Sequence, residues 1–356
     1  MNKIAKLMCL VAVIALIGTS CKKNEETVTC QGAFVEMNST EEGAKTYKVG
    51  NRIEWDADDM VEIFNVANGN NSFTHGTFSV SGAGNYATFT LMNGNITTQN
   101  QGAFYAFYPS GNQYVAKGGG FKEAWTTGNG HVKGLFLLPP VQQYRVINGI
   151  PAIPQGALAA AAKEENTSYL GDVRFNFQAI NGVLVLRYYL DDPSWVNTKK
   201  VDYITVTDKR VHIAGLMEVY LDKVNPTELM QKLNAFNPDD DVYMANLLTY
   251  KQQIGYYIPE PSANPYLSKT VKLQCKTDLD GQFPNGVTLG TSANTATIFN
   301  IALRPGAFSH GMVIQVHYTD GSYYVPYNDN GSPKLMIRPN TNTNMQPRRV
   351  AYQFAE

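Results

Sequence analysis

The residue with the most recognisable chemistry is Cys21, which directly follows three small residues at 18–20. Upstream lie Lys3, Lys6 and an apolar run from Leu7 to Ile17. A positive start, a short apolar core and small residues before a cut site are typical of a secretory signal peptide. The run is too short for a spanning helix, which needs about 20 apolar residues. A cysteine at the cut predicts a bacterial lipoprotein acylated on Cys21; the alternative is an ordinary signal peptide cut elsewhere.

Three acidic clusters could in principle bind a metal or act in acid–base catalysis. A pair of carboxylates can hydrolyse glycosides, and the segment DLDG at 278–281 begins like a calcium loop but lacks the later ligands. The five histidines are scattered and no G-x-S-x-G is present. We therefore expect no catalytic residues, no metal and no cofactor, with a glycosidase as an alternative. The clusters are Asp56, Asp58 and Asp59; Asp239 to Asp241; and Asp278 with Asp280.

The composition gives no reason to expect a nucleic-acid partner or an anionic membrane surface. The formal net charge is −1 and 17% of residues are charged. Tyr (21) and Phe (16) are plentiful beside Asn, Thr and Gly, which suits an all-β extracellular protein. After processing, Cys30 and Cys275 remain, and we expect two small buried hydrophobes, with one long-range disulfide as the alternative.

Period-two alternation predicts strands along most of the chain. Met312 to Tyr318, Asp320-Gly321 and Tyr323 to Tyr327 together predict a β-hairpin with a type I′ turn. The segment VRFNF at 173–177 alternates apolar and polar residues, and NGVLVLRYYL at 181–190 is apolar on both faces, like a central sandwich strand. Many short strands with Gly, Asn and Pro turns indicate β-sandwiches.

Helical signals are few. Pro226 with TELMQKL could start a short amphipathic helix, and ALAAAAKEE at 157–165 is either a short helix or a strand edge. A Pro-rich stretch and a polar run precede a fresh set of strong strands, so we place a division near residue 172. The predicted organisation is a signal peptide at 1–20, a lipidated tether at 21–29, an N-terminal β-sandwich domain at 30–172 and a C-terminal one at 173–356.

Five segments, taken in order, resemble the fimbrillin-like surface lipoproteins of Bacteroidota, which build type V pili or act as their accessory and anchor subunits. CKKNEE at 21–26 also resembles the tract that sends such lipoproteins to the outer face of the outer membrane. The five segments are NRIEWDADDMVEIFN (51–65), GAFYAFYPSG (102–111), LLPPVQQY with PQGALAAA (137–144 and 154–161), VRFNFQAINGVLVLRYY (173–189) and FNIALRPGAFSHGMVIQVHYTDG (299–321).

The resemblance implies two tandem transthyretin-like Greek-key β-sandwich domains that assemble by β-strand complementation. In such assembly a protease removes the first strand, and the terminal strand of a neighbouring subunit fills the groove. Here the first strand would be QGAFVEMN and the last RVAYQF. The strand-exchange residues implied are Ala33, Phe34, Val35 and Met37 in the first strand, with Ala33, Val35 and Met37 on one face, and Val350, Tyr352 and Phe354 in the last.

The loop after the first strand bears on the role of the subunit. Polymerising members are cut there by an Arg-specific protease, whereas this loop carries Lys45 and Lys48, and the nearest arginine is Arg52. Stalk, anchor, accessory and tip roles therefore all stay open. The partners implied are other fimbrial subunits, a host or bacterial surface receptor, and the outer membrane through a lipid anchor.

The alternative function is that of a surface glycan-binding lipoprotein. Aromatic side chains on a sandwich can stack on sugars. The candidates are Trp125, Trp195 and the Tyr-rich edge from Tyr323 to Tyr327.

Overall fold

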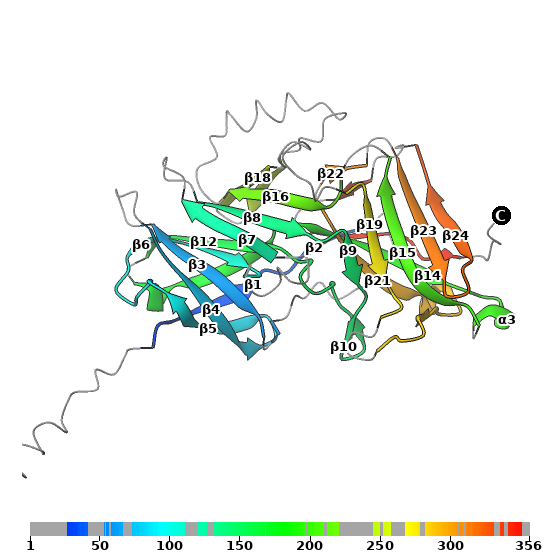
Figure 1. The fold of residues 1–356 in the computed structure, drawn as a ribbon, viewed down its shortest axis with the longest axis horizontal. Coiled ribbons are helices and arrows are strands. Elements are labelled where there is room, and N and C mark those ends of the chain that lie inside the picture. Colours follow the sequence, from blue (N-terminus) through cyan, green and yellow to red (C-terminus); the bar gives the residue numbers. More distant parts are fainter. Residues whose placement is uncertain are drawn as a thin grey trace, which may run out of the picture.

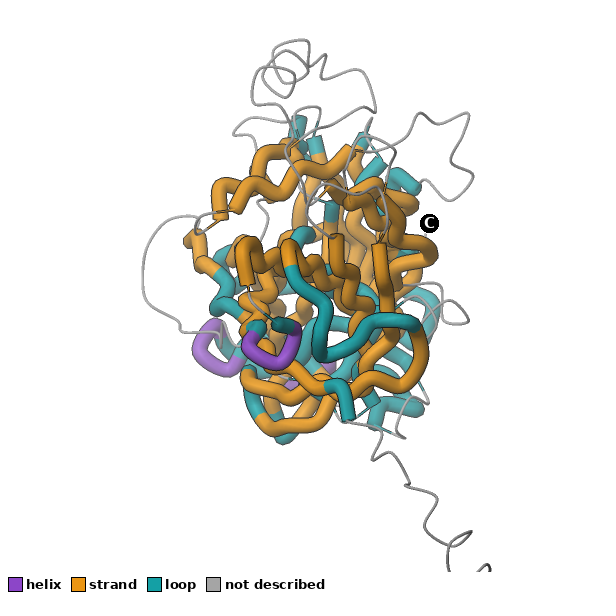
Figure 2. Tube along the Cα trace, turned by 90° about the vertical axis from the view of Figure 1, so that its left-hand side faces the viewer, coloured by secondary structure: helices purple, strands orange, loops and turns teal. Residues whose placement is uncertain are grey.

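The segments with alternating apolar residues form β-strands in the described part of the computed structural model (Figures 1 and 2), which confirms the all-β class. Within the described residues the helical elements are α3 (Pro193–Val196) and the 3₁₀ turns η2 (Leu170–Asp172) and η5 (Ala293–Thr295). No helix in this part of the chain is long and apolar enough to span a bilayer. The structure describes residues 27–350 except 42–52, 54, 57, 67–72, 111–119, 127–131, 168, 197, 210–211, 221–244, 250–251, 258–267, 278–281, 305, 309–310, 331–334 and 338–340.

The N-terminal strands form a sheet that closes on itself, drawn in blue to green at the left of Figure 1. We call it the closed sheet. Closure leaves none of its strands at an edge. In spatial order its strands are β1 (Thr29–Phe34), β13 (Arg174–Ala179), β12 (Ala160–Thr167), β6 (Gly102–Tyr108), β3 (Met60–Val66), β4 (Phe73–Ala83) and β5 (Tyr86–Gly94), which pairs again with β1.

The remaining strands form three larger sheets and two small ladders. The first sheet runs β2 (Asn38–Glu41), β26 (Thr341–Asn344), β14 (Gly182–Tyr189) and β21 (Thr297–Leu303), with β27 (Arg348–Arg349) also on β14. The second runs β24 (Tyr323–Asn328), β23 (Met312–Tyr318), β15 (Lys200–Asp208), β19 (Thr270–Gln274) and β9 (Val141–Gln143), with β20 (Val287–Thr288) on β15. The third runs β17 (Ala245–Thr249), β18 (Gln252–Tyr257), β16 (Gly215–Tyr220), β8 (Val132–Leu138) and β7 (Gly120–Thr126). The ladders are β10 (Val146–Ile147) with β11 (Ile150–Pro151), and β22 (Gly306–Ala307) with β25 (Met336–Ile337).

The closed sheet takes one strand from beyond the predicted division at residue 172. β13 begins at Arg174 and pairs with both β1 and β12. In the opposite direction, β2 and β9 leave the N-terminal part of the chain to pair with strands of the C-terminal sheets. The chain therefore crosses between the two halves several times, and the position of a domain boundary stays a prediction.

Two hydrophobic cores share a wall made of β3, β6, β12 and β14. In β6, Phe104 and Ala106 face the core of the closed sheet, while Tyr105 and Phe107 face the second core. Strand β14 divides in the same way between its valines and its leucines, which is why both of its faces are apolar from Val183 to Leu186. Strands buried on both faces lose the polar alternation of surface strands.

The ambiguous segment ALAAAAKEE is a strand from Ala160 onward. Ala160 and Ala162 belong to the core of the closed sheet, and Ala157, Ala159 and Ala161 to the second core. Alanine has high helix propensity, but here its small side chain lets two apolar layers approach one strand from opposite sides. Tertiary packing overrides the local preference.

The predicted hairpin forms, but its turn differs from the prediction. β23 and β24 pair antiparallel, with His317 opposite Tyr323. A type I′ turn needs positive φ at both central residues. Here the Gly321 N–H donates to the Tyr318 carbonyl, so the central residues are Thr319 and Asp320. The positive φ of 88° falls on Gly321, the last residue of the turn. The type I′ prediction is therefore wrong. The Asp320 carboxylate accepts hydrogen bonds from the Ser322 hydroxyl (2.6 Å) and from the Ser322 N–H (3.1 Å), and these bonds stabilise the turn that is observed.

Cys30 and Cys275 are both buried and unpaired, as expected of small hydrophobes. They lie in different cores, Cys30 in the closed sheet and Cys275 in the second core. Burial raises the pKa of each thiol well above its usual range. Neither is therefore activated for thiolate chemistry.

The shared wall predicts that Ala160→Leu destabilises the protein. The side chain of Ala160 is fully buried, so a larger residue forces neighbouring strands apart at a cost of about 1–3 kcal/mol. Urea unfolding monitored by tryptophan fluorescence would measure the loss. Ala293→Leu, at an exposed site, is the matched control and should change stability by less than about 0.5 kcal/mol. Equal effects at both sites would contradict the wall.

Candidate site of strand exchange

Strand β1 is held on both sides by backbone pairing. It runs antiparallel to β5, with Cys30 opposite Phe89, and parallel to β13, with Gly32 opposite Phe175. Just past its end, the Val35 N–H donates to the Phe177 carbonyl at 2.8 Å. Removing β1 would therefore leave two strands with unpaired backbone groups facing each other.

The inward face of β1 is apolar and ends in an aromatic cluster. Cys30, Gly32 and Phe34 point into the core of the closed sheet. The Phe34 ring stacks on Trp55 with centroids 4.1 Å apart and meets Tyr108 edge-on at 5.4 Å. The side chain of Phe34 thus fills an aromatic pocket at one end of the strand.

The first strand is shorter than predicted, and its residues therefore do not all lie on the predicted faces. Ala33 and Val35 are half-buried and lie off the core. Met37 was expected to share their face, but it is 3% exposed and joins the same core as Phe34. The pairing of β1 ends at Phe34, so strict alternation no longer governs the residues that follow.

Gly32 marks the closest approach along β1. A Cβ atom added there would lie 2.5 Å from Phe89 Cε2 and 3.2 Å from Phe177 Cε2. Real Cβ atoms do not approach carbon atoms at 2.5 Å, so the two rings occupy the space of the missing side chain. Glycine lets the aromatic core close over the middle of the strand.

The same N-terminal segment continues into a second sheet. β2 lies at the edge of its sheet and pairs parallel with β26, with Asn38 opposite Thr341 and Glu41 opposite Asn344. Residues 29–41 therefore complete the closed sheet and also cover one edge of a C-terminal sheet. Both would be opened if this segment left.

The terminal segment is paired up to the last described residue. β27 runs parallel to β14, and the Val350 N–H donates to the Tyr189 carbonyl at 3.0 Å. The Val350 side chain is 1% exposed and belongs to the second core. Several predicted site residues lie outside the described residues: Cys21, Lys45, Lys48, Arg52, Tyr352 and Phe354.

The aromatic residues that were candidates for glycan binding are either packed against the second core or stacked on neighbouring rings. Trp195, Tyr324 and Tyr327 are partly buried and pack against the second core. Tyr323 faces outward and stacks on His317 at 5.5 Å, and His317 in turn stacks on Tyr203 at 4.2 Å. These contacts are those of cross-strand packing. The Trp125 side chain lies outside the described residues.

The acidic cluster before β3 has a structural role. Asp59 is 2% exposed, and its carboxylate accepts the Asp56 N–H at 2.8 Å and the Tyr108 hydroxyl at 2.9 Å. Arg145 donates to the Asp56 carboxylate at 3.1 Å. Within the described part of the chain, no three His, Cys, Asp or Glu side chains gather as a metal site would require. Residues 239–241, Asp278 and Asp280 lie outside it.

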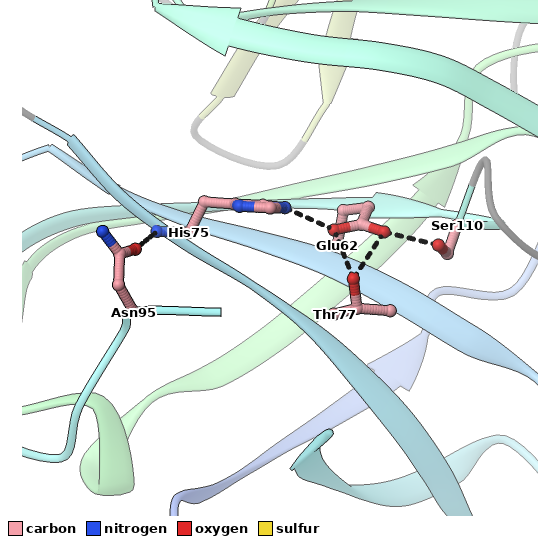
Figure 3. A network of polar contacts seen from close by, with 5 residues as sticks. All are labelled: Glu62, His75, Thr77, Asn95 and Ser110. Carbon is pink, nitrogen blue, oxygen red and sulfur yellow. Dashed lines mark hydrogen bonds and ion pairs between the residues drawn. The ribbon is translucent and has the colours of Figure 1, made fainter. Parts of the chain in front are cut away.

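A buried carboxylate on the second face of β3 went unnoticed in the sequence. Glu62 accepts the Ser110 hydroxyl at 2.5 Å and the Thr77 hydroxyl at 3.0 Å, and its other oxygen lies 3.0 Å from His75 Nε2 (Figure 3). The Asn95 side-chain oxygen accepts the backbone N–H of His75 at 2.8 Å. The only sequence signal is a lone charge inside the apolar run MVEIFNV.

The order of contacts around Glu62 is not that of a hydrolase triad. In such a triad a histidine lies between the nucleophile and the acid, whereas here the carboxylate lies between Ser110 and His75 (Figure 3). Ser110 is fully buried. The arrangement ties β3, β4 and the end of β6 together.

No protein-family model and no curated protein matches this chain. Among solved structures, a "putative cell adhesion protein" from Bacteroides uniformis has a TM-score of 0.44 and 11% identity, covering 94% of this chain and 99% of that one. A protein of the same description from Bacteroides ovatus has a TM-score of 0.41 and 10% identity, covering 93% and 96%. A fimbrial protein from B. ovatus has a TM-score of 0.24 and 10% identity, covering 91% of this chain and 50% of that one.

The close packing around Gly32 predicts that Gly32→Ala loosens β1. The added methyl group must displace the Phe89 ring, at a cost of about 1–3 kcal/mol. Amide hydrogen exchange over residues 29–35 should accelerate, because local opening becomes easier. Gly171→Ala is the matched control, since its nearest neighbour would lie 4.0 Å away. Equal exchange in both variants would contradict the prediction.

The Glu62 network predicts that Glu62→Ala is strongly destabilising. The change leaves the Thr77 and Ser110 hydroxyls without their acceptor, and each unsatisfied buried group costs about 1–3 kcal/mol. Urea unfolding would measure the change in free energy. Glu36→Ala, at an exposed position, should stay within about 0.5 kcal/mol of the parent chain. A similar small effect for Glu62→Ala would refute the structural role.

Proposed function

We propose that this chain is a surface-exposed, lipid-anchored fimbrial or adhesion component, and that it associates with other subunits by β-strand complementation. It acts without catalysis, as a stalk, anchor, accessory or tip subunit. In this proposal its two halves are tandem transthyretin-like domains, and Cys21 carries the anchor in the outer membrane. The fimbrillin-like sequence motifs and the lipoprotein signal support the surface location.

The observation that carries the proposal is the position of β1 between β5 and β13. A strand paired on both sides leaves, when removed, two rows of free N–H and C=O groups. Such rows recruit an incoming strand, and alternate side-chain pockets select its residues. The pockets here are the sites of Cys30 and Phe34, of which the second is lined by Trp55 and Tyr108.

The sequence of the terminal segment suits an incoming strand. Val350, Tyr352 and Phe354 recur at every second position, so they would share one face of an extended strand. Large apolar side chains at that spacing match a groove that offers one aromatic and one smaller pocket on the same side. A neighbouring copy or a related subunit would supply this strand.

Cleavage followed by assembly tests the proposal. Limited trypsin digestion of residues 22–356 should cut at Lys45, Lys48 or Arg52, release the first strand and produce a ladder of oligomers in native mass spectrometry. Amino-terminal sequencing identifies the cut. The outcome follows because trypsin cleaves after Lys or Arg and the released strand exposes the groove.

A triple variant with Lys45→Gln, Lys48→Gln and Arg52→Gln is the matched control. It should keep its first strand and stay monomeric under the same digestion. A parent chain that is cut in this loop, loses residues 29–41 and still stays monomeric would overturn assembly by strand complementation.

A further inference from the structure

A hollow of about 430 Å³ lies beside the β10–β11 ladder, whose strand β10 is labelled at the lower centre of Figure 1. One wall is the hairpin with its Asn148-Gly149 turn, where both residues have positive φ (51° and 79°) as a type I′ turn requires. The opposite wall is the segment 282–288. Lys200 of β15 and Thr297 of β21 complete the lining. The volume falls in the range of small-ligand sites.

The two walls are fixed to each other and to the sheets behind them. The Gln282 side-chain amide donates to the Val146 carbonyl at 2.9 Å, and its oxygen accepts the Val146 N–H at 3.0 Å. The Asn300 side chain donates to the Pro151 carbonyl at 2.9 Å. Polar side chains thus hold both strands of the hairpin at its open end. The hollow is preformed, which lowers the entropy cost of binding.

The segment 282–288 is shaped by a turn that requires glycine. The Gly286 N–H donates to the Phe283 carbonyl at 3.0 Å, and Gly286 has a φ of 83°. A Cβ atom on Gly286 would lie 2.6 Å from the Val201 carbonyl oxygen. The tight turn places Asn285 among the lining residues.

The lining combines an aromatic surface with unused polar groups. Phe283 is partly buried and lies 5.1 Å from the Tyr144 ring. Tyr144 is 4% exposed and belongs to the second core. The Lys200 ammonium has no ion-pair partner among the described residues, and the described lining contains no Asp or Glu.

These groups define the chemistry of a ligand. An unpaired ammonium selects a carboxylate, a partly exposed aromatic ring selects an apolar C–H face, and hydroxyl and amide groups select a polyol. A monosaccharide that bears a carboxylate has all three features and fits the volume.

We propose that this hollow binds an acidic sugar, such as a uronic or sialic acid residue of a glycan. Lys200 pairs with the sugar carboxylate, the Phe283 ring packs against the C–H face of the pyranose, and the Asn285 amide bonds to ring hydroxyls. This goes beyond the proposed function, because binding here requires neither cleavage of the first strand nor subunit assembly.

Saturation-transfer NMR on the uncleaved chain 22–356 tests the site, with glucuronic acid and N-acetylneuraminic acid as probes. Glucose and acetate serve as the comparison ligands. We expect at least one acidic sugar to bind more tightly than both glucose and acetate. Equal binding of glucose would remove the carboxylate from the proposal, and equal binding of acetate would reduce the site to a plain carboxylate site; either result overturns it.

Variants place the binding in the hollow. Lys200→Ala should weaken acidic-sugar binding about tenfold. Thr288 lines the hollow and is exposed, so Thr288→Trp should abolish binding by filling the hollow with the larger side chain. Lys269→Ala, an exposed lysine at the other end of the same sheet, is the matched control and should bind as the parent does. Unchanged binding in both hollow variants, with unfolding curves intact, overturns the site. Failure of the trypsin experiment would leave these results untouched.

Discussion

The shared wall of β3, β6, β12 and β14 constrains the rest of the fold, because its strands must bury side chains on both faces. A surface strand can place a polar residue at every second position, but a strand between two cores cannot. The wall meets this condition with aromatic and branched residues in β6 and β14, and with a run of alanines in β12. Charged side chains also enter the wall at Glu62 and Arg187. Around Glu62, the neighbouring hydroxyls and an imidazole supply hydrogen bonds. The two halves of the molecule therefore have a common interior boundary and are not joined by a simple linker.

The N-terminal segment has a different relation to the structure. It is not part of the wall and contributes side chains to one core alone, that of the closed sheet, yet β1 completes one sheet and β2 covers the edge of another. Its attachment depends on backbone pairing and on the fit of Phe34 and Gly32 among aromatic rings. In the proposed assembly this segment is the one replaced by another strand, whereas a strand of the wall cannot be removed without exposing both cores. This contrast gives strand complementation a physical basis in the chain.

Local patterns in the sequence predicted the strands well, because side-chain alternation depends on neighbouring residues. VRFNF, the Met312–Tyr318 hairpin and the doubly apolar β14 all form as expected. Features that depend on distant partners could not be predicted in the same way. The strand at ALAAAAKEE is decided by two cores, and the network at Glu62 joins β3 to β4 and to Ser110, which follows β6. The hollow near Lys200 is likewise formed by a hairpin and a loop that is distant in the sequence, so no residue spacing could predict it.

The parallel pairing of the N-terminal segment also sets the order in which the protein can fold. Gln31 pairs with Arg174, and Asn38 pairs with Thr341. The residues that are synthesised first therefore wait for partners from the middle and from nearly the end of the chain. Such non-local contacts form slowly, and until they form the edges of the sheets are open to other chains. Under the proposed function, a copy whose first strand has not yet paired would offer the site of β1 to a strand from another subunit, so the order of folding and the order of assembly would be linked.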